Sequence, residues 1–139
     1  MLALIAVLGL QAAIAGGTSP SAELVAKIGA LKQRITGAKS QGEKLDGLRA
    51  LKRYVETDAQ SLPSRATGRD ERRKLVMTVE ALRVYFGHVD FGLIREGKCD
   101  EARALISQSA DPRATSPESL PGEAREASEA LNAACAQGL

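Results

Sequence analysis

The first candidates for chemistry in this chain are its two cysteines, Cys99 and Cys135. They are far apart in the sequence, only one histidine is present, and no C-x-x-C motif occurs. Tetrahedral zinc requires four ligands with short local spacings, and thiol–disulfide exchange typically uses a C-x-x-C pair, so neither chemistry is favoured. In an oxidising compartment two such cysteines most often pair. We predict a structural disulfide and no metal site, with free or functional thiols as the alternative.

His88 and Asp90 are the only conspicuous pairing of a histidine with a carboxylate residue. Two residues apart on a helix, their side chains point in different directions, so Asp90 is poorly placed to orient His88 as a catalytic base. No G-x-S-x-G motif, glycine-rich phosphate loop or haem-attachment motif occurs. The sequence therefore predicts no catalytic residue, no cofactor and no enzyme. His88 is interpreted as a partly exposed helix residue or, alternatively, as a pH-sensitive contact.

A candidate basic patch lies between residues 65 and 74, where five cationic side chains are concentrated. Its members are Arg65, Arg69, Arg72, Arg73 and Lys74. Such a patch would bind anionic lipid, lipopolysaccharide or an acidic protein face, and the alternative is a solvated loop whose charge Asp70 and Glu71 partly offset. The net charge of the whole chain is only +2, which gives no argument for nucleic-acid binding.

The first fifteen residues carry no charge, and residues 2–10 form a short apolar run. The sequence AIA at 13–15 fits the small-residue rule of signal-peptide cleavage, and the run is shorter than the roughly 20 apolar residues that span a bilayer. We expect a signal peptide over 1–15 and one domain over 16–139, located in the periplasm or outside a bacterial cell. A buried N-terminal helix and an uncleaved anchor are the alternatives. No later stretch is apolar enough for a membrane span.

The elements that position these residues are expected to be helices, because apolar residues recur at spacings of three and four and no β-period is found. Ser19 and Pro20 are a typical helix start, and Ser40 begins a capping box for a second helix. The two apolar stripes that follow are Leu24, Ile28, Leu31 and Ile35, then Leu45, Leu48, Leu51 and Val55. Their short connection predicts an antiparallel helical hairpin.

A long helix is predicted from about Asp70 to about Glu96. Its main stripe is Leu75, Val79, Leu82, Phe86, Val89 and Leu93. A second stripe, Met77, Val84 and Phe91, lies on the opposite side of the same helix. A surface helix would be polar there. The second stripe is therefore interpreted as the other packing face of a central helix or, alternatively, as a candidate partner-binding face.

Two shorter helices complete an all-α fold of about five helices. One runs from about Cys99 to Ser109, and the other is Ala-rich, begins near Pro117 or Pro121, and ends near Cys135. Its expected apolar face is Ala124, Ala127, Leu131 and Ala134. If the two helices are antiparallel neighbours, the two cysteines meet. Closing that loop stabilises the fold by about 3 to 4 kcal/mol in the chain-entropy description.

Residues 86–112 resemble one tetratricopeptide repeat, a helix–turn–helix unit. Gly97 stands at the turn glycine of that family, and Ala102 at the small residue that lets the paired helices approach closely. The larger apolar positions of the repeat are occupied by Phe86, Val89, Leu93 and Ile106. Positions that depart from the pattern are Asp90, Cys99, Ser109 and Pro112. The resemblance implies a helical hairpin of this geometry and, through the family, protein–protein interaction.

The expected function is that of an exported, non-enzymatic adaptor that binds a protein partner. A small apolar-ligand carrier, with a pocket near Phe86, Phe91 and Met77, is the alternative from a different class. A third possibility is a cytosolic or membrane-anchored partner protein, should the N-terminal segment stay attached. A flat exposed apolar patch favours the adaptor, whereas a concave apolar pocket with converging polar groups favours the carrier.

Overall fold

A computed structural model describes residues 19–109 and 122–135 of the chain. Within these two ranges the protein is helical and contains no strand, as the sequence predicts. In chain order the elements are α2 (Pro20–Gly37), α3 (Gln41–Glu56), the 3₁₀ helix η1 (Asp58–Ser61), α4 (Leu62–Arg65), α5 (Arg69–Gly87), α6 (Phe91–Arg95), α7 (Cys99–Ser109) and α9 (Gly122–Cys135).

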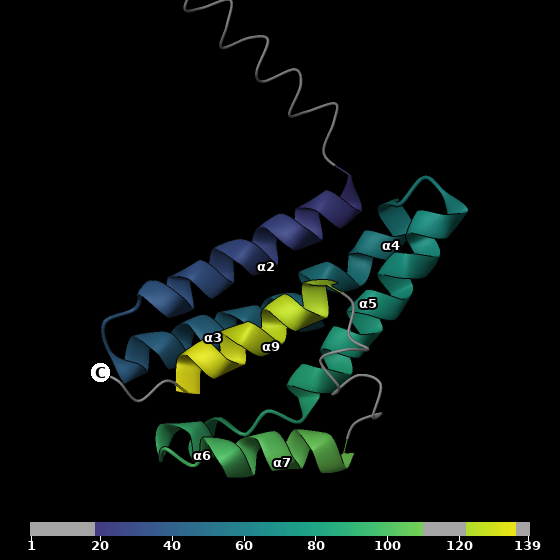
Figure 1. The fold of residues 1–139 in the computed structure, drawn as a ribbon. Helices are drawn as coiled ribbons and strands as arrows, with labels where there is room; N and C mark the ends of the chain where they lie inside the picture. Colours follow the sequence, from purple (N-terminus) through teal and green to yellow (C-terminus); the bar gives the residue numbers. More distant parts are fainter. Residues whose placement is uncertain (1–18, 110–121, 136–139) are drawn as a thin grey trace, which may run out of the picture.

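The hairpin of α2 and α3 is confirmed, and both helices begin at serine caps. The Oγ of Ser19 accepts a hydrogen bond from the backbone N–H of Ala22, and the Oγ of Ser40 accepts one from Glu43, each at 3.1 Å. These caps satisfy N–H groups that have no partner within the helix. All eight residues of the two predicted apolar stripes are buried. The two helices lie antiparallel along one side of the molecule (Figure 1).

The expectation of one long helix from Asp70 to Glu96 is wrong, because α5 ends at Gly87 and a new helix, α6, begins at Phe91. The carboxylate of Asp90 accepts a hydrogen bond from the N–H of Leu93 at 3.1 Å and caps α6. Aspartate competes well for such cap positions, and glycine lowers the helix propensity of the segment before it. The apolar spacing of three and four residues continues through this break, so the spacing alone does not predict where α5 ends.

The break changes which side chains face the core. The first four members of the predicted stripe, from Leu75 to Phe86, are buried. Beyond the break Val89 is still buried, but Ile94 is fully buried in place of Leu93, which is only partly covered. The orientation of α6 therefore differs from the continuation of α5 (Figure 1).

The turn between α6 and α7 is made at Gly97, whose φ of 78° is the only positive φ within the described residues. The N–H of Gly97 donates to the carbonyl of Ile94 at 3.0 Å, and that of Lys98 to Leu93 at 2.8 Å. Left-handed backbone after a helix strongly favours glycine. Ala102 is fully buried in α7. The turn glycine and the buried small residue expected from the tetratricopeptide resemblance are present, but the expected first helix is divided by the break at 88–90. The resemblance itself stays a prediction.

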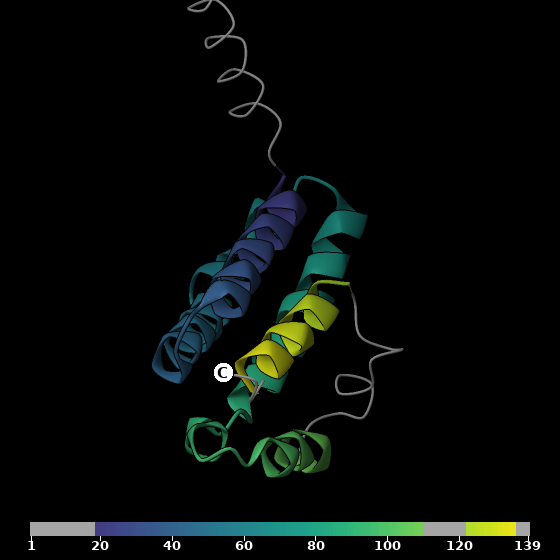
Figure 2. The ribbon, with the colours of Figure 1, turned by 60° about the vertical axis from the view of Figure 1, so that its left-hand side comes forward.

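The last helix, α9, runs alongside α2 in the same direction and occupies the space between α2 and the lower part of α5 (Figure 2). The Nζ of Lys32 lies 2.6 Å from a carboxylate oxygen of Glu126 and 2.8 Å from one of Glu129. Three of the four residues of the predicted apolar face are buried, namely Ala127, Leu131 and Ala134, and the side chain of Ala124 lies outside the described part. The main contacts of α9 are thus with α2 and α3 rather than with α7.

Polar groups close the end of the molecule where α3 begins. The Nε2 of Gln41 donates to the carbonyls of Ile94 and Ala134, at 3.5 and 3.3 Å, and so joins α3 to the ends of α6 and α9. The buried Nζ of Lys44 donates to the carbonyl of Ile35 at 3.2 Å, in the last turn of α2. A cation at that position is favourable, because the C-terminal carbonyls of a helix carry partial negative charge. In the described ranges, no helix is sufficiently long and apolar to traverse a membrane.

Candidate functional site

The predicted disulfide between Cys99 and Cys135 is confirmed. It joins the first residue of α7 to the last residue of α9, the Cα atoms are 5.8 Å apart, and both residues are buried. One helical turn away from the disulfide, the Nε of Arg103 in α7 donates a hydrogen bond to the Oδ1 of Asn132 in α9 at 3.0 Å. The two helices are therefore antiparallel where they meet, as expected. A disulfide fits an oxidising compartment.

The histidine–carboxylate pair has local structural roles. His88 is the C-cap residue of α5 and is half-buried, while Asp90 caps α6. Within the described ranges, no group of three His, Cys, Asp or Glu side chains is arranged to hold a metal ion. The prediction of no enzyme and no cofactor stays a prediction.

The candidate partner-binding face is not one continuous face. Met77 is 63% exposed on α5. Val84, about two helical turns later on the same helix, is partly buried against the core. Phe91 belongs to α6 beyond the break, and its ring lies 5.2 Å from the guanidinium carbon of Arg49. Phe86, the third residue of the expected carrier pocket, is fully buried in the core. Neither Phe86 nor Phe91 lines the two cavities described below.

The candidate basic patch is divided among three environments. Arg65 forms a two-pronged ion pair with Glu23, at 3.1 and 2.9 Å, which holds the pKa of the Glu23 carboxyl below its ordinary value. Arg72 donates to the carbonyl of Ala66 at 3.1 Å, and Arg69 begins α5. Arg73 and Lys74 line a cavity.

That cavity, the α2–α5 cleft, brings together residues from both the predicted patch and the predicted partner face. Its volume is about 670 Å³, and it is lined by Ser21, Asp70, Glu71, Arg73, Lys74 and Met77. Val25, one helical turn after Ser21, is 50% exposed and lies on the same side of α2 as Ser21. The cleft thus combines exposed apolar surface with two cationic and two carboxylate side chains.

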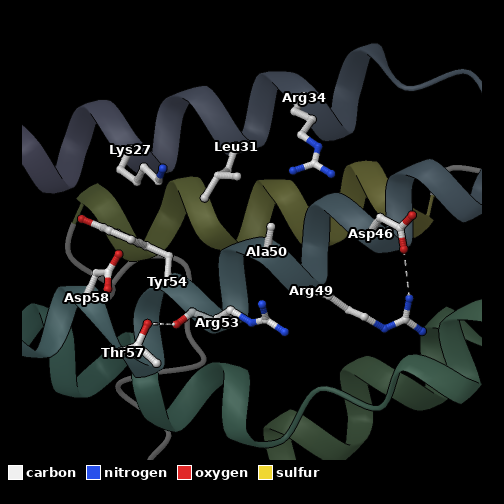
Figure 3. Close-up of a pocket in the computed structure, with 10 residues that line it drawn as sticks. All are labelled: Lys27, Leu31, Arg34, Asp46, Arg49, Ala50, Arg53, Tyr54, Thr57 and Asp58. Atoms are coloured by element: carbon white, nitrogen blue, oxygen red, sulfur yellow. Dashed lines mark hydrogen bonds and ion pairs between the residues drawn. The ribbon is translucent and has the colours of Figure 1, made fainter.

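A second cavity lies between α2 and α3 and is called the α2–α3 groove (Figure 3). It has a volume of about 460 Å³ and is lined by Lys27, Leu31, Arg34, Asp46, Arg49, Ala50, Arg53, Tyr54, Thr57 and Asp58. Four of these side chains are cationic and two are carboxylates. In Figure 3 the guanidinium of Arg34 points from α2 toward α3, while Arg49 and Arg53 extend in a common direction along α3.

The two ends of the groove differ in electrostatic character. At one end the Nη1 of Arg49 lies 3.4 Å from the carboxylate of Asp46, with Arg34 opposite on α2. At the other end Lys27 lies above the ring of Tyr54, its Nζ 5.8 Å from the ring centroid. Burial raises the pKa of the Tyr54 hydroxyl, and the negative charges of Glu23 and Asp58 raise it further while Arg65 opposes them. Each end thus combines cationic groups with a carboxylate, namely Arg34, Arg49 and Asp46 at one end and Lys27 and Asp58 at the other.

Replacing Tyr54 by phenylalanine is expected to raise the free energy of unfolding by about 1 kcal/mol, because a buried polar group without a partner costs stability. Tyr54 is 7% exposed, and its hydroxyl is the one buried side-chain N or O atom in the described part of the chain that lacks a hydrogen-bond partner. Phenylalanine keeps the packing of the ring. Urea unfolding followed by circular dichroism measures the change, and a clear loss of stability would show that the hydroxyl has a partner.

Neither cavity could be identified from the sequence. The groove residues are spaced at three and four along α3, from Asp46 to Thr57, but the same pattern describes any solvated helix face. Only the pairing of α2 with α3 brings Lys27 and Arg34 beside them. The cleft likewise depends on how the first turns of α5 lie beside the start of α2.

A comparison of the chain with protein-family models, with curated proteins and with solved structures finds no match in any of the three.

Proposed function

We propose that this protein is an exported, non-catalytic adaptor that docks a helical segment of a protein partner in the α2–α5 cleft. The observation that carries the proposal is the exposure of Met77, 63% accessible on a helix whose opposite face is packed, at the border of an open cavity. Large apolar side chains exposed beside a cavity are typical of interaction sites. The disulfide supports export, because such bonds persist in oxidising compartments.

A helical partner is supported by the position of α9 between its neighbours. Since Lys32 contacts Glu126, α9 begins near the middle of α2. Beside the first half of α2, the short helix α4 contacts both α2 and α5, and the cleft is lined by Ser21 of α2 and by residues of α5. From Pro20 to Ile28, α2 rises about 12 Å, slightly more than two helical turns. A partner helix of that length would continue the line of α9.

The chemistry of the cleft defines the partner segment. Met77 and Val25 offer apolar contact, and the cleft also presents both signs of charge, from Asp70 and Glu71 and from Arg73 and Lys74. The matching segment is an amphipathic helix with an apolar stripe and charges of both signs on its flanks, which is a common mode of helix-in-groove recognition.

Site-specific photo-crosslinking in the native host tests this proposal. A photoreactive amino acid is placed at Ser21 or Met77, on the two sides of the cleft, and at Leu105 as a control. Leu105 is 38% exposed on α7, at the other end of the molecule (Figure 1). We expect both cleft positions to crosslink to the same segment of one envelope or secreted protein, and Leu105 not to do so.

The crosslinked segment is then synthesised, and its affinity is measured by fluorescence anisotropy. Met77→Lys is expected to weaken binding by about tenfold or more, because burial of a methionine side chain contributes about 1.5 to 3 kcal/mol. Leu105→Lys, the matched control, leaves the affinity unchanged. Crosslinks from Leu105 to the same segment, or equal affinity of wild type and Met77→Lys, would contradict docking in the cleft.

A further inference from the structure

We infer that the α2–α3 groove is a binding site for a small anion, recognised through its phosphate or carboxylate oxygens. The groove shares no residue with the α2–α5 cleft, so this inference stands apart from the docking proposal. Its volume of about 460 Å³ is typical of small-molecule sites.

The arginines at the groove are available to a ligand. Within residues 19–109 and 122–135, neither Arg34 nor Arg53 forms an ion pair. Arg49 has a single contact of 3.4 Å with Asp46, longer than the roughly 2.7 to 2.9 Å of a strong charge-assisted hydrogen bond. Its guanidinium also lies over the ring of Phe91, which fixes its position without using its N–H groups.

Guanidinium groups determine the kind of anion that fits. Each presents several N–H donors in a planar fork that matches the geometry of carboxylate and phosphate oxygens. Arginine keeps its charge at physiological pH, so the N–H donors remain available there. An oxyanion near Arg34, Arg49 and Arg53 would replace water as the acceptor for these donors.

The ligand orientation follows from the number of cationic groups at each end. The anionic group belongs at the end formed by Arg34 and Arg49, where two guanidinium groups lie with one carboxylate, Asp46, whereas the tyrosine end has one cation, Lys27, with Asp58. Leu31, 8% exposed, and the partly buried Ala50 provide an apolar floor between the ends. A small carbon framework attached to the anionic group would cover this floor.

A small anion is favoured over a nucleic acid because the positive charge is local. The whole chain has a net charge of +2, whereas the ten groove residues alone carry four cations and two carboxylates. Nucleic-acid binding requires an extended basic surface that follows the phosphate backbone.

Isothermal titration calorimetry of the disulfide-bonded protein tests the inference with three probes: inorganic phosphate, pyrophosphate and citrate. Sodium chloride of equal ionic strength is the blank. We expect saturable binding of at least one probe, and the preferred probe distinguishes phosphate chemistry from carboxylate chemistry. Absence of saturable binding by all three at millimolar concentration would overturn the inference, as would binding only of an extended polyanion such as heparin.

Substitutions locate the site. The double variant Arg34→Gln/Arg53→Gln is expected to bind the preferred probe about tenfold more weakly or worse, because charge-assisted hydrogen bonds from two forks are lost. Arg95→Gln, an exposed arginine of α6 outside the groove, is the matched control and is expected to change the affinity less than about twofold. All three positions are exposed, so the variants should fold, which circular dichroism verifies. An equal loss in the control would overturn the assignment to the groove.

Discussion

Replacement of Cys99 and Cys135 by serine is expected to lower the free energy of unfolding by about 3 to 4 kcal/mol. The disulfide closes a loop across a sequence separation of 36 residues, and its loss restores the freedom of that loop in the unfolded chain. Both side chains are buried, so serine also places two hydroxyl groups in apolar surroundings. Urea unfolding of the oxidised wild type and of the double variant measures the difference.

Two controls separate the crosslink from the substitution. Reduced wild type should lose stability as the variant does, and a Cys99→Ala/Cys135→Ala variant removes the cost of buried hydroxyls. Hydrogen exchange should show the first loss of protection in α9, which is otherwise held by the ion pairs of Lys32, the hydrogen bond from Gln41 and a face built mostly of alanine. A change below about 1 kcal/mol in every variant would contradict the predicted contribution of the disulfide to the free energy of unfolding.

Gly47→Ala is expected to lower the free energy of unfolding by about 1 to 3 kcal/mol, the usual cost of forcing an extra methyl group into a packed interface. A Cβ at Gly47 would lie 2.7 Å from the Cγ1 of Ile35, a fully buried side chain of α2. Because Ile35 is branched and enclosed, relief requires a shift of α2 against α3. Thermal and urea unfolding measure the effect.

Gly29→Ala is the matched control, because Gly29 also lies inside a helix but a Cβ there meets no atom within 4 Å. Alanine is a better helix former than glycine, so this variant should gain about 0.5 to 1 kcal/mol. Opposite signs for the two substitutions are the expected pattern. If Gly47→Ala stabilised the protein as Gly29→Ala does, α2 and α3 would not approach closely at Gly47.

The hairpin and the disulfide could be predicted because each depends on short-range information. Serine caps and stripes spaced by three and four define α2 and α3 directly, and both stripes are buried as expected. Because the sequence offers no set of further metal ligands near the two cysteines, a disulfide is the favoured interpretation. The all-helical class follows from the same periodicity.

The division of the predicted long helix could not be read from periodicity, because Val89 keeps its place in the pattern and is buried. The available signal was Asp90 between two glycines, Gly87 and Gly92, a combination typical of a helix end followed by a new cap. Local cap chemistry therefore determines the chain path here, while apolar spacing alone predicts a continuous helix.

The candidate sites depend on helix pairing, which the sequence does not encode locally. The predicted basic patch is contiguous in sequence, yet Arg65 pairs with Glu23 of α2 and Arg72 contacts the backbone of Ala66. The groove, by contrast, combines cations from two helices that are unremarkable when each is considered alone. Which charges converge is determined only when α2 packs on α3 and the start of α5 lies beside the start of α2.

The most direct test of the proposal that this is an exported, disulfide-bonded protein is its intact mass. The protein is recovered from its native host, and its thiols are alkylated before and after reduction. The expected mass corresponds to a chain that begins at Gly16, with Cys99 and Cys135 alkylated only after reduction. A chain that retains residues 1–15 and has both thiols free before reduction would contradict export and the function proposed for it.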